Sequence, residues 1–192
     1  MKSKQNKFII IFFLFISFTS FSQVRLPKLI SDGMILQRDA KVKIWGWASG
    51  NENVSIHFLD STYQTKADVD GNWDIELSDL KAGGPYKMEI NANNSITIND
   101  IMIGDVWVCS GQSNMEHSLG SFDWVYKKEI ANSTNGYIRQ FYVPQKYNFD
   151  EPQKDLQAGS WKAANPKNVV YFSAVAYFFG KAIYDKYKVP VG

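Results

Sequence analysis

Ser113 is the side chain whose neighbours best suit it to act as a nucleophile. It lies in the stretch GDVWVCSGQSNM (residues 104–115), with Gly111 two residues before it and Asn114 directly after it. A nucleophilic serine needs exposure at the end of a strand, amide donors that hold an oxyanion, and a base that removes its proton. Gly111 allows a sharp turn, after which Ser113 would open a helix with its own N–H as one donor. The spacing alone leaves a helix-capping role open.

The sequence offers no clear base for this serine. His117 lies four residues after Ser113, so the two side chains can share a helix face, yet no acidic residue is clearly placed to orient the imidazole. A base role for His117 therefore competes with that of a partly exposed helix residue. His57 lies on a predicted strand, on the face opposite the apolar side chains of that strand, so it is expected to be a surface residue. Met115 stands where the G-x-S-x-G elbow of α/β-hydrolases has its second glycine, so the motif is not that elbow.

Three other residues near Ser113 have simpler structural roles. Cys109, the only cysteine, lies in an apolar run and is expected to be a buried packing residue. Glu116 either orients a group near Ser113 or stabilises a helix start through the dipole. Asp105 is expected to end a turn rather than bind a metal, because no His/Cys/Asp cluster has the spacing of metal ligands. The sequence implies no metal or organic cofactor.

Residues 24–103 show the alternation of apolar and polar side chains that is typical of strands with one buried face. The clearest examples are residues 42–47, 54–59 and 86–90. Stretches rich in Gly, Asn, Asp and Pro separate them. Several short strands at this spacing predict an antiparallel β-sandwich over residues 23–103.

The pattern changes after residue 104. Residues 106–109 form a continuous apolar run, which predicts a strand covered on both faces, and residues 138–143 are a second candidate strand. A helix is predicted around residues 175–183, with Ser173 as its candidate N-cap. Strand, crossover and helix together indicate the first part of an α/β domain with a parallel sheet, residues 104–192.

This α/β part is too small to complete a sheet. It stops at residues 189–192, where a helix has ended and another strand is expected. A helix whose apolar stripe needs a sheet would then remain partly uncovered, which soluble monomers rarely tolerate. We therefore expect a truncated chain. The alternative is a complete small domain whose strands pair with another subunit.

The N-terminus predicts a signal peptide over residues 1–22. Three lysines precede the apolar run of residues 8–18, and Ser20-Phe21-Ser22 fits a cleavage site. The run is too short to span a bilayer, which needs about twenty residues. An uncleaved membrane anchor is the alternative. Cleavage would change the formal charge from +2 to −1, so we expect a secreted or periplasmic protein with no nucleic-acid partner and no stable membrane association.

The stretch around Ser113 resembles the nucleophile block of the sialate O-acetylesterase family, a branch of the SGNH-type esterases. Residues 29–48, 71–90 and 171–192 also resemble segments of that family, in the family's order. The resemblance thus extends over nearly the whole mature chain. It implies that this chain corresponds to the N-terminal portion of a protein of that family. It implies a β-sandwich followed by the incomplete first part of an SGNH hydrolase-like domain.

The resemblance also implies chemistry. Ser113 would attack the acetyl ester of an O-acetylated carbohydrate, with a histidine from a late Asp-x-x-His-type block as base. The oxyanion hole would combine the serine N–H with a Gly and an Asn from intermediate blocks. Only the serine block maps onto this sequence, so the chain alone is expected to be nearly inert, because loss of a triad base costs about 10⁶ in turnover.

A second hypothesis is a noncatalytic carbohydrate-binding module built on the β-sandwich. Trp45, Trp47 and Trp73 would form its sugar-stacking platform. Core and inter-domain packing is the competing role for these side chains, since tryptophan usually buries most of its surface.

Overall fold

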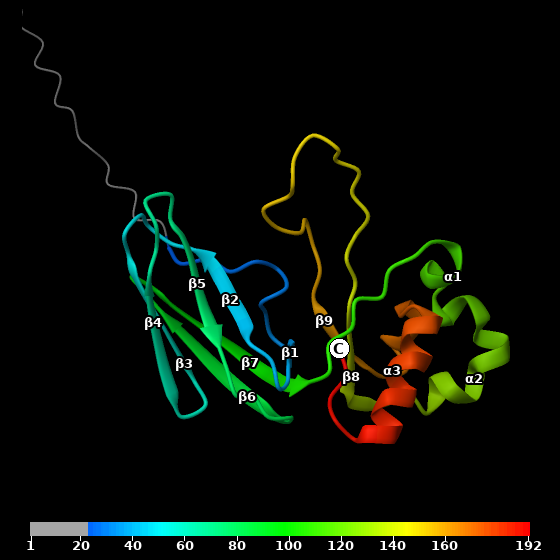
Figure 1. Cartoon of the computed structure of the whole chain (residues 1–192). Helices are drawn as coiled ribbons and strands as arrows, with labels where there is room; N and C mark the ends of the chain where they lie inside the picture. Colours follow the sequence, from blue (N-terminus) through cyan, green and yellow to red (C-terminus); the bar gives the residue numbers. More distant parts are fainter. Residues whose placement is uncertain (1–22) are drawn as a thin grey trace, which may run out of the picture.

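The computed structural model describes residues 23–192, so the predicted signal peptide lies outside the described residues. A strand-rich part lies beside a part that contains the helices (Figure 1). The chain passes from the first to the second after Gly104, where the last long strand ends. The molecule is thus a mixed, sheet-rich structure with few helices.

Seven strands make up the first part. They are β1 (Ile35–Gln37), β2 (Val42–Trp47), β3 (Asn53–Phe58), β4 (Ser61–Lys66), β5 (Asn72–Leu77), β6 (Gly83–Asn91) and β7 (Ser95–Gly104). One sheet has the order β1-β7-β6-β3-β4, and β2 pairs with β5 in a second sheet. All pairs are antiparallel except β1 with β7. The strands are therefore antiparallel as expected, apart from the pair of β1 with β7.

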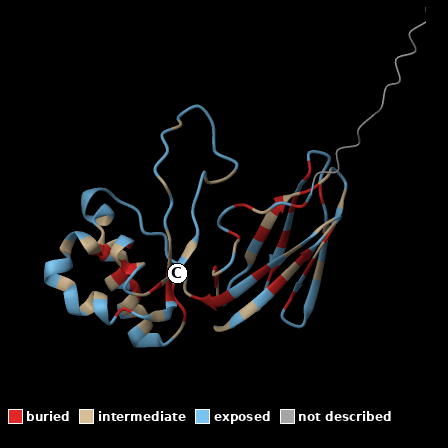
Figure 2. Ribbon diagram, turned by 180° about the vertical axis from the view of Figure 1, so that it is seen from behind, coloured by how far each residue is buried: buried red, intermediate tan, exposed pale blue. Residues whose placement is uncertain are grey.

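The two sheets bury their inward side chains in one hydrophobic core. Val54, Ile56 and Phe58 of β3 are buried, while His57 between them is exposed, as period-two alternation predicts. Ile75 of β5 belongs to the same core. Figure 2 shows buried positions alternating with exposed ones along these strands. Burial of this apolar surface is the main force that holds the strand-rich part together.

The second part consists of short helices, one long helix and two strands. They are α1 (Ser113–Glu116), the 3₁₀ helix η1 (Leu119–Phe122), α2 (Asp123–Ala131), β8 (Asn135–Phe141), β9 (Trp161–Ala164), the 3₁₀ helix η2 (Val169–Tyr171) and α3 (Ala174–Tyr187). The predicted long helix is confirmed as α3. Its N-cap is Ser173, whose Oγ accepts the N–H of Ala176 at 3.3 Å. β8 matches the second candidate strand, displaced toward the N-terminus, and pairs antiparallel with β9.

A parallel arrangement does form, but through single bridges. Val191 lies between Asp105 and Ile138 and is parallel to both. The N–H of Asp105 donates to the carbonyl of Pro190 at 2.8 Å, and the N–H of Val191 donates to the carbonyl of Tyr137 at 2.8 Å. The residues after α3 thus occupy the middle position that a parallel α/β sheet would give them.

The expected buried strand at residues 106–109 is wrong. These residues form no strand, Val108 is 94% exposed, and Cys109 is exposed as well. Only Trp107 continues the pairing, through its N–H to the carbonyl of Gly192 at 2.8 Å. An apolar run is buried on both faces only where layers cover both, and among residues 23–192 no second layer covers Val108.

Two arginines connect the parts. The Arg139 side chain is only 3% exposed. Its guanidinium donates to the carbonyls of Gly33 and Asp100 at 2.8 and 2.6 Å and to the Asp100 carboxylate at 2.8 Å. Arg38 donates to the carboxylate of Asp105 at 2.8 Å. These bonds fix β8, and the start of the segment that leads from Asp105 to Ser113, against the strand-rich part.

Backbone contact at the junction is close. A Cβ at Gly104 would collide with the carbonyl oxygen of Pro190, so only glycine fits there without movement of the backbone.

Within the described part of the chain, every helix falls short of the length and apolar character needed to cross a bilayer.

Candidate active site

Ser113 is exposed and is the first residue of α1. The N–H groups of Met115 and Glu116 both donate to the carbonyl of Gln112, and the N–H of His117 donates to the carbonyl of Ser113 at 3.1 Å. Within residues 23–192, the Ser113 Oγ makes no hydrogen bond, and the N–H groups of Ser113 and Asn114 meet no acceptor. The first N–H groups of a helix have no partner inside it, so these two are available to an oxyanion.

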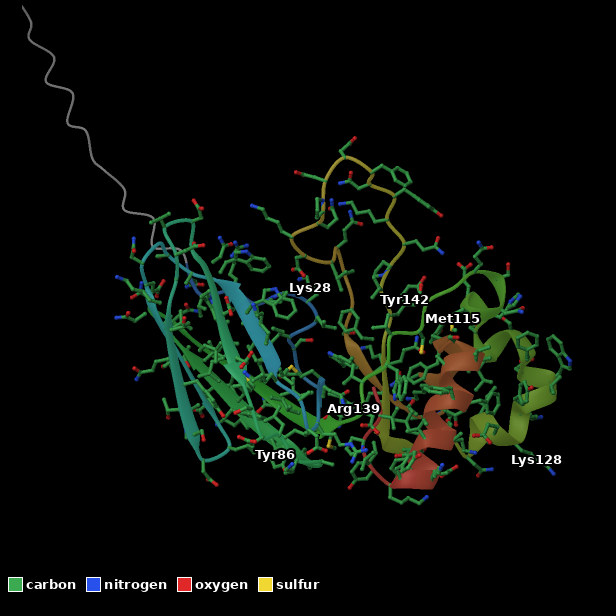
Figure 3. All side chains as sticks on the ribbon, in the orientation of Figure 1. Lys28, Tyr86, Met115, Lys128, Arg139 and Tyr142 are labelled. Carbon is green, nitrogen blue, oxygen red and sulfur yellow. The ribbon has the colours of Figure 1, made fainter. Side chains whose placement is uncertain are left out.

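The position of α1 is set by the start of α3. The N–H of Ala174 donates to the carbonyl of His117 at 2.9 Å, and the N–H of Leu119 donates to the carbonyl of Phe172 at 2.8 Å. The Ser173 hydroxyl lies 3.5 Å from the sulfur of Met115. Figure 3 shows Met115 at the upper end of α3. The turn around Ser113 (residues 110–116, the seryl turn) is therefore held by an element whose N-cap, Ser173, lies 60 residues later in the chain.

A cavity of about 710 Å³ lies beside the seryl turn. Ser110, Gly111 and Met115 line it on one side, and Trp45 and other residues of the strand-rich part line it on another. Ser113 is not among the lining residues. The turn thus borders a space large enough for a sugar residue, since small-molecule sites typically measure about 300–1,000 Å³.

The structure does not bring His117 to Ser113 as a base. His117 is exposed at the C-cap of α1, and its ring contacts Phe122 edge-on, with centroids 5.6 Å apart. No hydrogen bond joins the imidazole to Ser113 within the described residues. Its interpretation as an exposed residue at a helix end is therefore the better one, and a base must come from elsewhere.

Two acidic residues near the turn have structural partners. Asp105 accepts hydrogen bonds from Arg38, and this contact raises the pKa of the Arg38 guanidinium. Glu116 accepts a hydrogen bond from the Gln145 amide at 3.1 Å. In residues 23–192, no three His, Cys, Asp or Glu side chains are grouped so that they could hold a metal ion.

Gln145 was missed by sequence reasoning. It belongs to the long irregular segment between β8 and β9, which protrudes from the molecule (Figure 1). Tyr142 of the same segment, which is labelled in Figure 3, also lines the cavity. No periodic pattern marks this stretch, and the Glu116–Gln145 contact spans 29 residues of sequence. A local reading of the sequence has no signal for such a contact.

Comparisons with known proteins define the class. The fold matches that of a carbohydrate acetylesterase from Xanthomonas citri with a TM-score of 0.84 and 37% sequence identity, covering 88% of this chain and 39% of that one. The human sialate O-acetylesterase is 26% identical over an alignment of 188 positions, which covers 88% of this chain and 36% of the human protein. The mouse sialate O-acetylesterase is 25% identical over 187 residues, with 34% of its length covered. No protein-family model matches the chain.

These relatives place the chain among homologues of carbohydrate acetylesterases. Within that class, the predicted resemblance to the sialate O-acetylesterase family is confirmed. The chain spans little more than a third of the length of the relatives that it matches.

Proposed function

We propose that this chain is the N-terminal portion of an exported carbohydrate O-acetylesterase of the sialate O-acetylesterase type, with Ser113 as its nucleophile. The observation that carries the proposal is the exposed Ser113 at the start of α1, with its hydroxyl and N–H unengaged in residues 23–192, beside a cavity. In this proposal residues 23–103 form a β-sandwich, and residues 104–192 begin an SGNH-type α/β domain.

The proposed reaction is acyl transfer through the serine. The Ser113 Oγ attacks the carbonyl carbon of an acetyl ester and loses its proton to a base, while the N–H of Ser113 donates to the oxyanion. The sugar oxygen leaves with a proton, and the acetyl group stays on Ser113. Water then attacks this ester, releases acetate and restores the hydroxyl. The reaction as proposed uses no metal or organic cofactor.

The base and the remaining oxyanion donors belong, in this proposal, to the longer protein. The family resemblance implies a histidine from an Asp-x-x-His-type block, and a Gly and an Asn from other blocks, none of which maps onto this sequence. Removal of one oxyanion donor costs about 10²–10³ in turnover. We therefore propose that residues 1–192 alone have almost no esterase activity.

A noncatalytic carbohydrate-binding module is not favoured as the function of the whole protein. The relatives that match 88% of the chain are named as acetylesterases.

We also propose secretion or a periplasmic location, with a signal peptide cleaved after Ser22, and an O-acetylated sugar as substrate.

The test uses an extended chain that contains the region by which the relatives are longer. Ser113→Ala is expected to lower kcat on p-nitrophenyl acetate and on an acetylated glycan by about 10⁴–10⁶. Ser121→Ala is the matched control, because Ser121 is also exposed and lies in η1, away from the cavity lining. If the Ser113→Ala enzyme hydrolyses acetyl esters at the rate of the parent, Ser113 is not the nucleophile.

A further inference from the structure

The outer face of the β2–β5 sheet carries two tryptophans. Side chains alternate along β2, so that Ile44 and Gly46 face the core while Trp45 and Trp47 face outward and are half-buried. Trp73 of β5 lies on the inner face, is 3% exposed, and its indole N–H meets no acceptor within the described residues. The expected three-tryptophan platform is therefore wrong in one member, because Trp73 packs in the core.

The two outward indoles are held in place. The guanidinium of Arg25 lies 5.6 Å from the ring centroid of Trp47, within reach of a cation–π contact. Trp45 packs partly against the core. Residues two apart on a strand are separated by about 7 Å, so both indoles belong to one patch. Ordered aromatic side chains lose little conformational freedom when a ligand binds.

A hollow of about 550 Å³ lies over this face. Trp45 and Trp47 line it, together with a small exposed part of Trp73. Its charged lining consists of Lys43, Lys66, Asp68 and Asp74. Two cations and two carboxylates balance, so the hollow has no net charge to favour an ionic ligand. Lys43 and Asp74 pair at 3.3 Å.

The polar groups of the hollow are ordered as well. The Asp68 carboxylate accepts hydrogen bonds from the backbone N–H of Asn72 at 2.8 Å and from its side-chain amide at 3.0 Å. These bonds lower the pKa of Asp68 and keep it an acceptor at neutral pH. Lys66 forms no ion pair within residues 23–192, so its ammonium is free to donate. Flat apolar faces beside a few fixed polar groups are what a pyranose ring needs.

We propose that the outer face of β2 and β5, with Trp45 and Trp47 as stacking surfaces, is an accessory binding site for a neutral glycan chain. Lys43 and Trp45 also line the cavity beside Ser110 and Gly111, so the hollow and the cavity meet at these two side chains. A glycan bound along β2 extends toward the seryl turn. Glycan binding here requires no catalysis, whereas the orientation toward Ser113 rests on the proposed function.

The test is native gel electrophoresis of the full chain in gels that contain a soluble polysaccharide. Neutral glucomannan and xyloglucan are expected to retard the chain, and polygalacturonate at equal mass is not. Trp47→Ala is expected to weaken retardation by the neutral polymers about tenfold, because a central aromatic contact contributes most of the binding. Asp74→Ala, at an exposed position that leaves the core intact, is expected to weaken it as well.

Trp124→Ala is the matched control, because Trp124 is 74% exposed on α2 and lines neither space. It is expected to change retardation less than twofold. The proposal is overturned if no neutral polymer retards the chain, if only polygalacturonate does, or if Trp124→Ala weakens retardation as much as Trp47→Ala. Ser113→Ala is expected to retain full retardation. The gel therefore tests the glycan site, and the esterase assay tests the assignment of the nucleophile.

Discussion

Tyr177 is a buried tyrosine in a small polar network on α3. Its hydroxyl donates to Glu129 at 2.7 Å, and Lys181 pairs with the same carboxylate at 3.0 Å. Burial raises the pKa of Tyr177, and the hydrogen bond to the Glu129 carboxylate adds to the increase. The folded state therefore keeps a proton on this hydroxyl at a pH where the unfolded chain releases it.

This proton sets a pH dependence of stability. Above the ordinary tyrosine pKa of about 10, the unfolded state binds fewer protons than the folded state, so the free energy of unfolding falls as the pH rises. Tyr177→Phe is expected to flatten this fall in urea denaturation between about pH 9.5 and 11. Tyr171→Phe is the control, because Tyr171 is 78% exposed. Equal pH profiles for the parent and Tyr177→Phe would contradict the assignment.

Single residues of the candidate site were predictable where the signal is local. The glycine before Ser113 and the polar turn indicate a helix start, and α1 does begin at Ser113. The exposure of Cys109 was not predictable from its apolar neighbours, because burial depends on which other segments cover the strand. Gln145 and its contact with Glu116 left no local trace.

At the scale of elements, α3 depends on its cap. Ser173 accepts the N–H of Ala176 and also contacts Met115 of α1. Ser173→Ala is expected to lower the free energy of unfolding by about 1 kcal/mol, measured in urea. Ser173→Asp keeps an N-cap acceptor and is expected to restore most of the loss. A Ser173→Ala chain as stable as the parent would show that the cap contributes nothing.

Strands with one buried face and the long amphipathic helix were within reach of sequence analysis. β3 follows period two and buries the face that the alternation predicts. α3 forms where the periodicity predicts a helix, but it buries Ala174, Tyr177 and Gly180. Val175 and Phe179 of the expected apolar stripe are exposed, because no sheet covers that face within residues 23–192.

β9 was not within reach of sequence analysis, because its pairing with β8 joins residues distant in sequence and leaves no periodic pattern. A strand was expected after the helix, and Val191 does form parallel bridges there. The expected strand at 106–109 failed for another reason: within residues 23–192 no second layer covers Val108.

At the scale of the whole molecule, Arg139 connects the two parts. Its partners Gly33 and Asp100 lie 106 and 39 residues away in sequence, which is why no motif points to it. Arg139→Met keeps the length of the side chain but removes its donors. It is expected to destabilise the fold by about 2–4 kcal/mol, because two partly buried carbonyls and the Asp100 carboxylate lose a charged donor.

The control for Arg139→Met is Lys41→Met, which removes an exposed ion pair with Glu76. This change is expected to leave the midpoint of thermal unfolding nearly unchanged, because water screens an exposed ion pair. Thermal unfolding of both variants measures the difference. Similar midpoints would mean that Arg139 does not hold the parts together.

The missing side chain at residue 104 has a consequence for how such chains diverge. Gly104 lies against Pro190, with no room for even a methyl group between the two backbones. An alanine at 104 is tolerated only if the segment around residue 190 retreats, which would shift Val191 away from Asp105. Inherited substitutions at residues 104 and 190 are therefore expected to occur together in the same sequence.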